Sequence, residues 1–437
     1  MRNTLFTVPR TSPKQTDGIL YTKLLLRNEG NLVYESPTLR NARLADGRLV
    51  DVALDGASIA AVTPAAAAAS GADDLDLAGA LLLPALVNGH AHLDKTFVGA
   101  PWQPHRAGDT VPARVAAERA IRSTVATSVA ERAEALALEM VRFGTGTVRS
   151  HVDIDTELGL SSLDTLLELR ERMQDSLAMQ IVAFPQSGIL ASPGVAALLE
   201  EAVLRGADVI GGLDPHGFDR DAVAHLDIVF DLAAKHGVAV DIHLHDLGSA
   251  AVRQFDLIAD RTRALGLSGR VVVSHAYGLG SIALDEAKRI GGMLAHAGIS
   301  VMTNGPAGPM PPVLAMRAEG ATVFSGSDNI RDAWWPYGNG DMLDVARTVA
   351  YQSNFRTDTE LEVALDLVTA AAATAIGLDR YGIHPGARAD LLVLDGSAAA
   401  QAVASPPERR TVFHAGRIVS TTRVTTEQPT NPILTSL

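Results

Sequence analysis

Eight short, apolar, β-rich segments alternate with helix-like stretches through the middle of the chain, and this alternation limits the fold more than any other feature. The segments end at or near His92, His151, Phe184, Leu213, His243, His275, Thr303 and Asp328. The stretches rich in Ala, Leu, Glu and Arg are residues 111–142, 162–175, 194–205, 219–236, 250–266, 282–297, 341–354 and 360–376, with a shorter one after Pro312. This alternation predicts a parallel sheet, and eight strands predict an α/β protein built on a closed (β/α)8 TIM barrel. A doubly wound open sheet is the alternative, but it leaves unexplained why polar residues close six of the eight strands.

The two ends of the chain have a different texture from the middle. Residues 1–18 are polar, contain Pro and Gly, and are predicted to form an irregular arm. Residues 19–83 and 387–425 contain short β-type runs broken by turn pairs such as Asp-Gly. Because β-rich segments can pair even when they are far apart in sequence, we expect one small flanking β-sandwich domain beside a barrel of residues 84–386.

Composition excludes several classes of partner and of metal site. The net charge of −13 argues against nucleic acid or an anionic membrane as the main partner. The chain has no cysteine, so any metal must be held by His and carboxylate side chains. It contains neither an apolar run of membrane-spanning length nor a segment with the pattern of a signal peptide. We therefore expect a cytoplasmic protein with no membrane partner.

Four residues at the predicted strand ends have the chemistry of a metal site. His90 and His92 belong to the sequence HAHLDK, which follows an apolar run from residue 81 to 87 predicted as one buried strand. Side chains two apart on a strand share a face, so these imidazoles project together. His243 and Asp328 end two later strands, and barrel active sites lie at such ends. The four side chains could bind one divalent cation, Zn²⁺ or Fe²⁺, which lowers the pKa of a bound water and makes hydroxide available as the nucleophile.

Neighbouring residues fit proton transfer at such a centre. Asp328 could also accept the proton of the water, and His275 on the adjacent strand could hydrogen-bond the hydroxide or a developing oxyanion. Bridged two-metal sites generally need a carboxylated Lys or a Glu from the middle of the barrel. The fourth and fifth strands, 207–213 and 237–243, contain neither. One metal ion is the better prediction.

Six segments resemble, in order and spacing, the amidohydrolase superfamily: HAHLDK, RSHVD, IVAFPQ, DIHLHD, SHA and SDNIRDAWWP. The likeness covers about residues 20–420 and is strongest to the branch that holds cytosine deaminase and N-isopropylammelide isopropylaminohydrolase. It implies metal ligands at His90, His92, His243 and Asp328, with His275 as the catalytic histidine. It further implies that Gln186 hydrogen-bonds a ring carbonyl or ring nitrogen and that Trp334 forms an apolar wall for a flat heterocycle. We expect the adjacent Trp335 to pack in the core.

The chain departs from the cytosine deaminase pattern at two positions. Asp246 replaces a Glu that moves protons to the ring and the leaving ammonia, and Asn329 replaces a second Asp after the metal carboxylate. Both changes shorten or remove a proton carrier, which puts cytosine in doubt as the substrate. Lys95, His245 and Asp214 instead match the branch member that acts on isopropylammelide. Lys95 and His245 would then contact oxo groups of an electron-poor ring, while Asp246 and His245 either carry protons or support His243.

The resulting prediction is a metal-dependent amidohydrolase of the deaminase type. It hydrolyses an amino or alkylamino group from a pyrimidine- or triazine-like heterocycle by metal-hydroxide attack. Hydrolytic opening of a cyclic amide is one alternative, and a non-catalytic barrel that acts as an assembly subunit or sensor is another. Relatives of this shape form homo-oligomers, so we expect one here.

Overall fold

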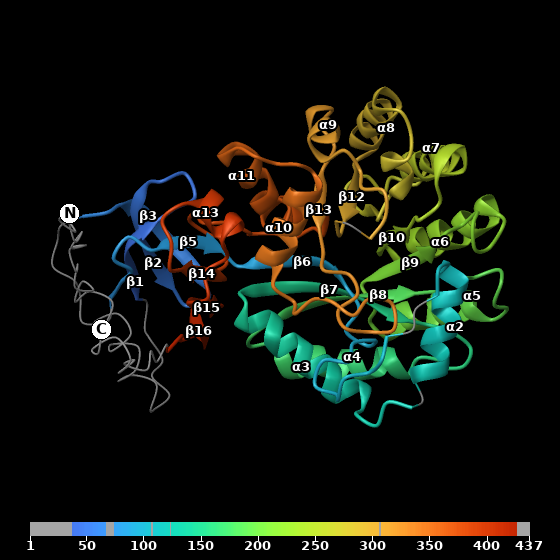
Figure 1. The fold of residues 1–437 in the computed structure, drawn as a ribbon, viewed down its shortest axis with the longest axis horizontal. Coiled ribbons are helices and arrows are strands. Elements are labelled where there is room, and N and C mark those ends of the chain that lie inside the picture. The colour runs from blue at the N-terminus through green and yellow to red at the C-terminus, as the bar shows by residue number, and fades with distance from the viewer. Residues whose placement is uncertain (1–36, 67–73, 106–107, 123, 306, 426–437) are drawn as a thin grey trace, which may run out of the picture.

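The computed structural model describes residues 37–66, 74–105, 108–122, 124–305 and 307–425; the predicted arm of residues 1–18 lies outside them. The middle of the chain forms one parallel sheet whose strands neighbour each other in sequence order (Figure 1). These strands are β6 (Leu86–Ala91), β7 (Thr145–Asp153), β8 (Ala178–Phe184), β9 (Val209–Leu213), β10 (Ala239–His243), β11 (Val271–Ser274), β12 (Ile299–Thr303) and β13 (Val323–Ser325).

The sheet closes where the last strand returns to the first. The backbone N–H of Asp328 donates to the carbonyl oxygen of His90 at 2.8 Å, and Ala91 and Asp328 form a parallel bridge. This approach needs a glycine at 326, because an added Cβ would lie 2.4 Å from the Cβ of His90. The predicted (β/α)8 barrel is confirmed, and its closure brings two predicted metal ligands together.

Helices lie outside the barrel strands (Figure 1). They are α2 (Val111–Arg122), α3 (Val129–Arg142), α4 (Ser161–Met173), α5 (Val195–Arg205), α6 (Ala222–His236), α7 (Gly248–Ala264), α8 (Leu284–Ala297), α9 (Val313–Ala318), α10 (Met342–Gln352), α11 (Asp358–Asp366) and α12 (Ala370–Ala375), with a 3₁₀ turn η1 (Tyr277–Gly280). Two predicted helices are each divided. The stretch 111–142 breaks before Ser128, which caps α3 in a reciprocal capping box with Glu131. The stretch 360–376 breaks near Thr369, whose backbone is not helical (φ −131°, ψ −106°).

Both ends of the chain build the flanking domain, as the sequence predicts, and its strands form one mixed sheet. Its strands are β1 (Thr38–Arg43), β2 (Leu49–Asp55), β3 (Ser58–Pro64), β4 (Leu75–Asp76), β5 (Leu81–Pro84), β14 (Leu391–Leu394), β15 (Arg410–His414) and β16 (Arg417–Thr421), and α13 (Ala399–Ala404) lies between β14 and β15. Strand β5 pairs antiparallel with β14 and so joins the two ends. The domain boundaries at 83/84 and 386/387 stay a prediction.

The apolar run before the HAHLDK segment forms two strands, not one. Strand β5 belongs to the flanking sheet and β6 to the barrel, and the chain changes sheet at Pro84 and Ala85. Proline has no N–H to donate to a continuing ladder, which favours a strand end here. The backbone N–H of Ala85 then bonds to Asp390 of the flanking domain, and that of Leu86 bonds to Gly144 beside the barrel.

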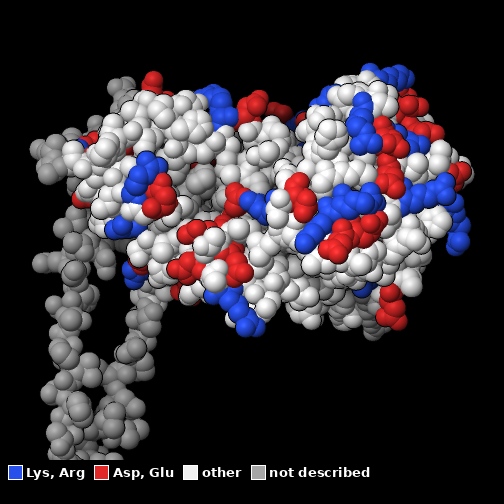
Figure 2. Space-filling view, turned by 90° about the horizontal axis from the view of Figure 1, so that it is seen from above, with Lys and Arg blue, Asp and Glu red and all other residues white. Residues whose placement is uncertain are grey.

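Acidic and basic side chains are interspersed over the face that Figure 2 shows. Among its described residues, this face has no continuous basic surface of the kind that binds nucleic acid. None of the helices in the described part of the chain has the length and apolar character needed to cross a membrane.

Candidate active site

A cluster of buried imidazoles and one carboxylate lies at the carboxyl ends of the barrel strands. His90, His243, His275 and Asp328 each offer a ligand atom, and these four atoms lie within 4.8 Å of one another. His90 comes from β6 and His243 ends β10, while His275 and Asp328 follow β11 and β13. The register of β10 and β11 places His243 opposite Ser274, so His275 follows directly beside it.

The atoms of this cluster fit a bound cation. Nε2 of His90, both ring nitrogens of His243 and His275, and Oδ1 of Asp328 are buried without a hydrogen-bond partner among the described residues. Buried polar atoms are rarely left unpaired, and imidazole nitrogens with a carboxylate oxygen are the donor set of zinc and iron sites. The residues present therefore fit a divalent metal ion.

The hydrogen bonds of His90 support the same conclusion. Oγ of Ser274 lies 2.6 Å from Oδ1 of Asp241 and 2.9 Å from Nδ1 of His90. Because the Ser274 hydroxyl donates its proton to the carboxylate, it must accept from the Nδ1–H of His90. The lone pair of His90 Nε2 then points toward Oδ1 of Asp328, 3.5 Å away. A cation between these two electron-rich atoms would satisfy both of them.

Asp241 is a site residue that the sequence analysis missed. Burial alone would raise its pKa, but His151 and Arg149 hold the pKa of Asp241 well below its usual range. Arg149 Nη1 lies 3.1 Å from Asp241 Oδ2, and His151 Nε2 lies 3.6 Å from Oδ1. The only sequence signal was an acidic residue inside an otherwise apolar strand. Its role here is to orient His90 through Ser274.

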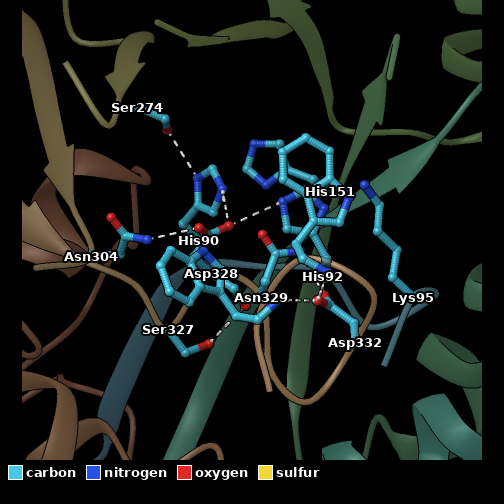
Figure 3. A network of polar contacts seen from close by, with 12 residues as sticks. His90, His92, Lys95, His151, Ser274, Asn304, Ser327, Asp328, Asn329 and Asp332 are labelled. Atoms are coloured by element: carbon cyan, nitrogen blue, oxygen red, sulfur yellow. Dashed lines mark hydrogen bonds and ion pairs between the residues drawn. The ribbon is translucent and has the colours of Figure 1, made fainter. Parts of the chain in front are cut away.

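His92 approaches the same carboxylate from the end of β6. Its Nε2 lies 3.3 Å from Oδ1 of Asp328, and Figure 3 shows His90 and His92 on either side of that oxygen. The structure thus brings the four predicted ligands together, with His275 also at ligand distance. His92 joins a second set of close ligand atoms with His90 and His151. Which of His92 and His275 completes the coordination stays a prediction.

The protonation states in the cluster suit metal binding. Burial lowers the pKa of His92, His243 and His275 well below the ordinary value, which keeps the rings neutral. Burial would raise the pKa of Asp328, but the surrounding imidazoles hold it well below its usual range. Oδ2 of Asp328 accepts a 2.7 Å hydrogen bond from Nδ2 of Asn304, which leaves Oδ1 free for the centre. Asn304, after β12, was also missed.

Three site residues have left-handed backbone conformations, which are costly for residues other than glycine. The φ angles are 37° at Asp214, 68° at His275 and 56° at Asp328. Such strain concentrates at functional sites, where the surrounding structure must fix it. The backbone here is held in the conformation that aims these side chains at the centre.

A cavity of about 230 Å³ opens over the cluster. Its floor includes His92, His243, His275 and Asp328, and its walls include the predicted substrate contacts Lys95, Gln186, His245, Asn329 and Trp334. Trp335 also lines the cavity and is only half-buried, so the expectation that it packs in the core holds only for its contact with the apolar cluster around Trp334. Its backbone N–H bonds to Asp332, as that of Trp334 does, and this shared anchor holds both indoles at the cavity.

Lys95 is a buried cation with three oxygen partners. Its Nζ lies 2.6 Å from Oε1 of Gln186, 2.9 Å from Oδ1 of Asp153 and 3.6 Å from Oε2 of Glu118. Burial alone would lower the pKa of Lys95, but the carboxylates raise it above its ordinary value, so the ammonium stays charged. An ammonium group only donates, which fixes the amide oxygen of Gln186 toward Lys95. Nε2 of Gln186 is then a buried donor without a partner among the described residues.

His245 is a second candidate cation at the wall. Its Nδ1 lies 2.9 Å from Oδ2 of Asp214, and its backbone N–H donates to Oδ1 at 2.6 Å. Burial would lower the pKa of His245, but Asp214 raises it above the ordinary value. The ring stacks on His275 with 4.5 Å between centroids. Asp214 itself is not among the residues that line the cavity and acts through His245.

The two positions that depart from the cytosine deaminase pattern have partners of their own. Oδ2 of Asp246 accepts from the backbone N–H of Gly217 and from Nε2 of Gln254, and Asp246 is not among the residues lining the cavity. This geometry favours structural support over proton transfer for Asp246. Asn329 lines the cavity and donates to Asp332, and burial raises the pKa of Asp332 to about 7.

Comparison with known proteins agrees with this architecture. The sequence pattern that defines the amidohydrolase family matches residues 75–420 of this chain. The chain belongs to the amidohydrolase family. The N-isopropylammelide isopropyl amidohydrolase of Pseudomonas sp. strain ADP is 30% identical over 359 residues, which are 79% of this chain and 88% of that protein. This membership confirms the predicted class, a hydrolase that acts on carbon–nitrogen bonds. The family and the His/Asp cluster together indicate a divalent metal ion.

Two crystal structures resemble this amidohydrolase over nearly its whole described length. N-isopropylammelide isopropylaminohydrolase from Burkholderia multivorans has a TM-score of 0.85 and 42% identity, and the match covers 89% of this chain and 99% of that one. The 5-methylcytosine deaminase of Klebsiella pneumoniae, liganded with phosphonocytosine, has a TM-score of 0.80 and 28% identity, covering 90% and 100%. The branch predicted from the sequence motifs is confirmed.

Proposed function

We propose that this amidohydrolase removes an amino or alkylamino group from a flat, oxo-bearing pyrimidine- or triazine-like ring. The observation that carries the proposal is the donor character of the cavity wall. Lys95 and Gln186 present hydrogen-bond donors, and His245 adds a third when its ring is protonated. Donors of this kind match oxo oxygens and unprotonated ring nitrogens. Relatives named for a substituted triazine and for 5-methylcytosine support this class of substrate.

Different side chains of the site would bind the metal ion, bind the substrate and transfer protons. His90, His92, His243 and Asp328 would hold one divalent cation, zinc or iron, which when bound supplies an acidified water at neutral pH. The neutral imidazole of His275 can take the proton that the attacking water loses. Asp328, as an ionised carboxylate, can share that proton and pass it to the nitrogen of the leaving amine.

The wall residues orient the ring for this attack. Lys95 and Gln186 would hold one oxo group or ring nitrogen, and His245 would hold another from the opposite strand ends. Trp334 provides a flat apolar face, with the ammonium of Lys95 5.6 Å from the centroid of its ring. Three fixed contacts leave the ring little rotational freedom, which is how positioning contributes to rate.

The test is a substrate panel with product identification. N-isopropylammelide, cytosine, 5-methylcytosine and a cyclic imide such as hydantoin are incubated with protein of known metal content, before and after chelation and after zinc or iron is restored. We expect release of amine or ammonia from an oxo-azine, lost on chelation and recovered with metal. A ring-opened acid as the main product would support the cyclic-amide alternative. Metal-loaded protein that turns over nothing would support the non-catalytic alternative.

Gln186→Leu tests the donor that carries the proposal. The variant removes the free Nε2 donor, and we expect the KM for the active oxo-azine to rise about tenfold, the value of one good hydrogen bond. Gln186→Glu should raise it further, because a carboxylate acceptor would face an oxo oxygen. Steady-state kinetics and metal content measure the effect. An unchanged KM in both variants would remove Gln186 from the substrate site.

The homo-oligomer and the cytoplasmic location expected from the sequence stay predictions. Light scattering of the purified protein measures the first, and fractionation of the cells that produce it measures the second. The identity of the metal is read from elemental analysis of the same preparation.

A further inference from the structure

Helix α2 contributes a buried carboxylate behind the wall of the cavity. Val115 and Glu118 are the buried residues of this helix, while Val111 and Arg114 line the cavity itself. Val115 packs in an apolar cluster with Phe97 and Trp334. Glu118 therefore lies behind the wall of the substrate cavity and is not among the residues that line the cavity.

Glu118 contacts two of the wall residues and also interacts with the carboxyl group of Asp153. Its Oε2 accepts a 2.6 Å hydrogen bond from Nε1 of Trp334 and lies 3.6 Å from Nζ of Lys95. An ionised carboxylate is costly to bury unless such partners compensate it. The two contacts differ in kind, because the indole N–H fixes the rotation of the ring whereas the ammonium supplies charge.

Arg114 of α2 also lies over the Trp334 ring, 5.9 Å from its centroid, whereas two arginines at the end of the helix make contacts that do not reach these wall residues. Arg119 donates to Oγ of Ser187 at 2.6 Å. Arg122 bonds to Asp155 at 3.1 Å and to Glu157 at 3.0 Å. Side chains after β7 and β8 therefore hold the end of the helix. Glu118 is not needed for these contacts and instead binds Trp334 and Lys95 in the cavity wall. A contact such as Arg122 with Glu157 offers a matched control, since it restrains α2 without touching Trp334 or Lys95.

We propose that Glu118 is a positioning residue that fixes the indole of Trp334 and the ammonium of Lys95 in the geometry that selects a flat, oxo-bearing ring. The inference rests on the proposed function for its substrate. Glu118 acts from behind the wall through the two side chains that it holds. Its loss should therefore weaken binding of the ring more than it slows the chemical step.

The kinetic test compares three variants with N-isopropylammelide as the substrate. Glu118→Leu removes both contacts, and we expect KM to rise at least tenfold while kcat falls less than threefold and bound metal is unchanged. Glu118→Gln retains an oxygen for the Trp334 N–H and should recover a large part of the loss. Glu157→Gln, the matched control, should leave KM within twofold of the wild type. A KM within twofold in Glu118→Leu, or an equal rise in Glu157→Gln, would overturn the proposal.

Trp334→Phe adds a test of the route. If Glu118 acts through the indole, the effects on KM of Trp334→Phe and Glu118→Leu overlap, and the double variant is less impaired than the product of the two single effects. Full additivity would exclude this route. Should Glu118→Leu fail to fold, Glu118→Ala, which also lacks an acceptor for the indole N–H, replaces it in this comparison.

A spectroscopic measurement keeps this inference separate from the proposed function. The chain has three tryptophans, so protein labelled with 5-fluorotryptophan gives few fluorine resonances, and Trp334→Phe identifies that of Trp334. We expect Glu118→Leu to shift this resonance and leave that of Trp102 in place. An unmoved Trp334 resonance overturns the positioning role even in an active enzyme. A shifted resonance in a protein that hydrolyses none of the panel supports the positioning contact while the proposed function fails.

Discussion

Replacing His275 by alanine is expected to lower kcat about 10³-fold while the protein keeps its metal. A proton carrier at the reacting centre typically contributes 10²–10⁴-fold to the rate. The buried ring is neutral because burial lowers its pKa well below the ordinary value, so one ring nitrogen carries a lone pair that can receive a proton. Turnover of the active oxo-azine and elemental analysis of the same preparation measure both quantities.

His92→Ala is the matched comparison, because the geometry admits either imidazole as a metal ligand. His275 shares a set of close ligand atoms with His90, His243 and Asp328, whereas Nε2 of His92 lies 3.3 Å from the same carboxylate. We expect His92→Ala to lose metal and activity together. If His275→Ala loses the metal and His92→Ala keeps it, the two roles must be exchanged. Retained activity in His275→Ala would remove it from the proton path altogether.

The sequence predicted those features that depend on local periodicity. His90 and His92 are two residues apart at the end of a strand, so their shared direction follows from strand geometry alone. His243 and Asp328 end other strands, and the barrel topology brings all strand ends to one rim. The structure places these side chains around one carboxylate oxygen, as that reasoning requires.

The residues that the sequence did not reveal depend on closure of the barrel and on loop packing. Ser274 and Asp241 orient His90 only because β10 and β11 adjoin and the ring then closes against Asp328. Asn304 belongs to no recognisable motif. It contacts Asp328 because β12 and β13 end side by side, with Thr303 paired to Ser325. Glu118 is one charged residue among many in an Ala-, Glu- and Arg-rich helix, and only the fold of α2 over the cavity distinguishes it.

The buried charges around Lys95 connect substrate recognition to stability. One ammonium faces Asp153 and Glu118 inside the protein, and the same group fixes Gln186 as a donor. Burial raises the pKa of Asp153 well above its ordinary value in spite of the nearby ammonium. Burial would raise the pKa of Glu118 as well, but Lys95 and the hydrogen bonds hold it below its ordinary value. Asp153 and Glu118 therefore share the negative charge that faces Lys95.

Lys95→Met is accordingly expected to destabilise the protein by about 3–5 kcal/mol at neutral pH, the usual cost of breaking a buried pair by removing one partner. Without the ammonium, burial should raise the folded-state pKa of Glu118 above its unfolded value. Below its unfolded-state pKa such a carboxyl group is protonated in both states and does not oppose folding. As the pH rises through its folded-state pKa, the buried group ionises and the free energy of unfolding falls. The defect of the variant should thus shrink toward pH 4 and grow toward pH 8. Thermal unfolding midpoints of wild type and variant across this range measure it.

Lys235→Met is the control, since Lys235 pairs with Glu200 on the surface and its side chain is 63% exposed. An exposed pair contributes at most about 1 kcal/mol, so this variant should show a small and nearly pH-independent change. The double variant Lys95→Met with Glu118→Leu should recover part of the lost stability at pH 8, because it removes one of the two carboxylates that Lys95 had compensated. The contrary result is a Lys95→Met defect that is equal at pH 4 and pH 8 and that Glu118→Leu does not relieve. It would show that the stability of this wall depends on packing of the lysine stem and not on an uncompensated carboxylate.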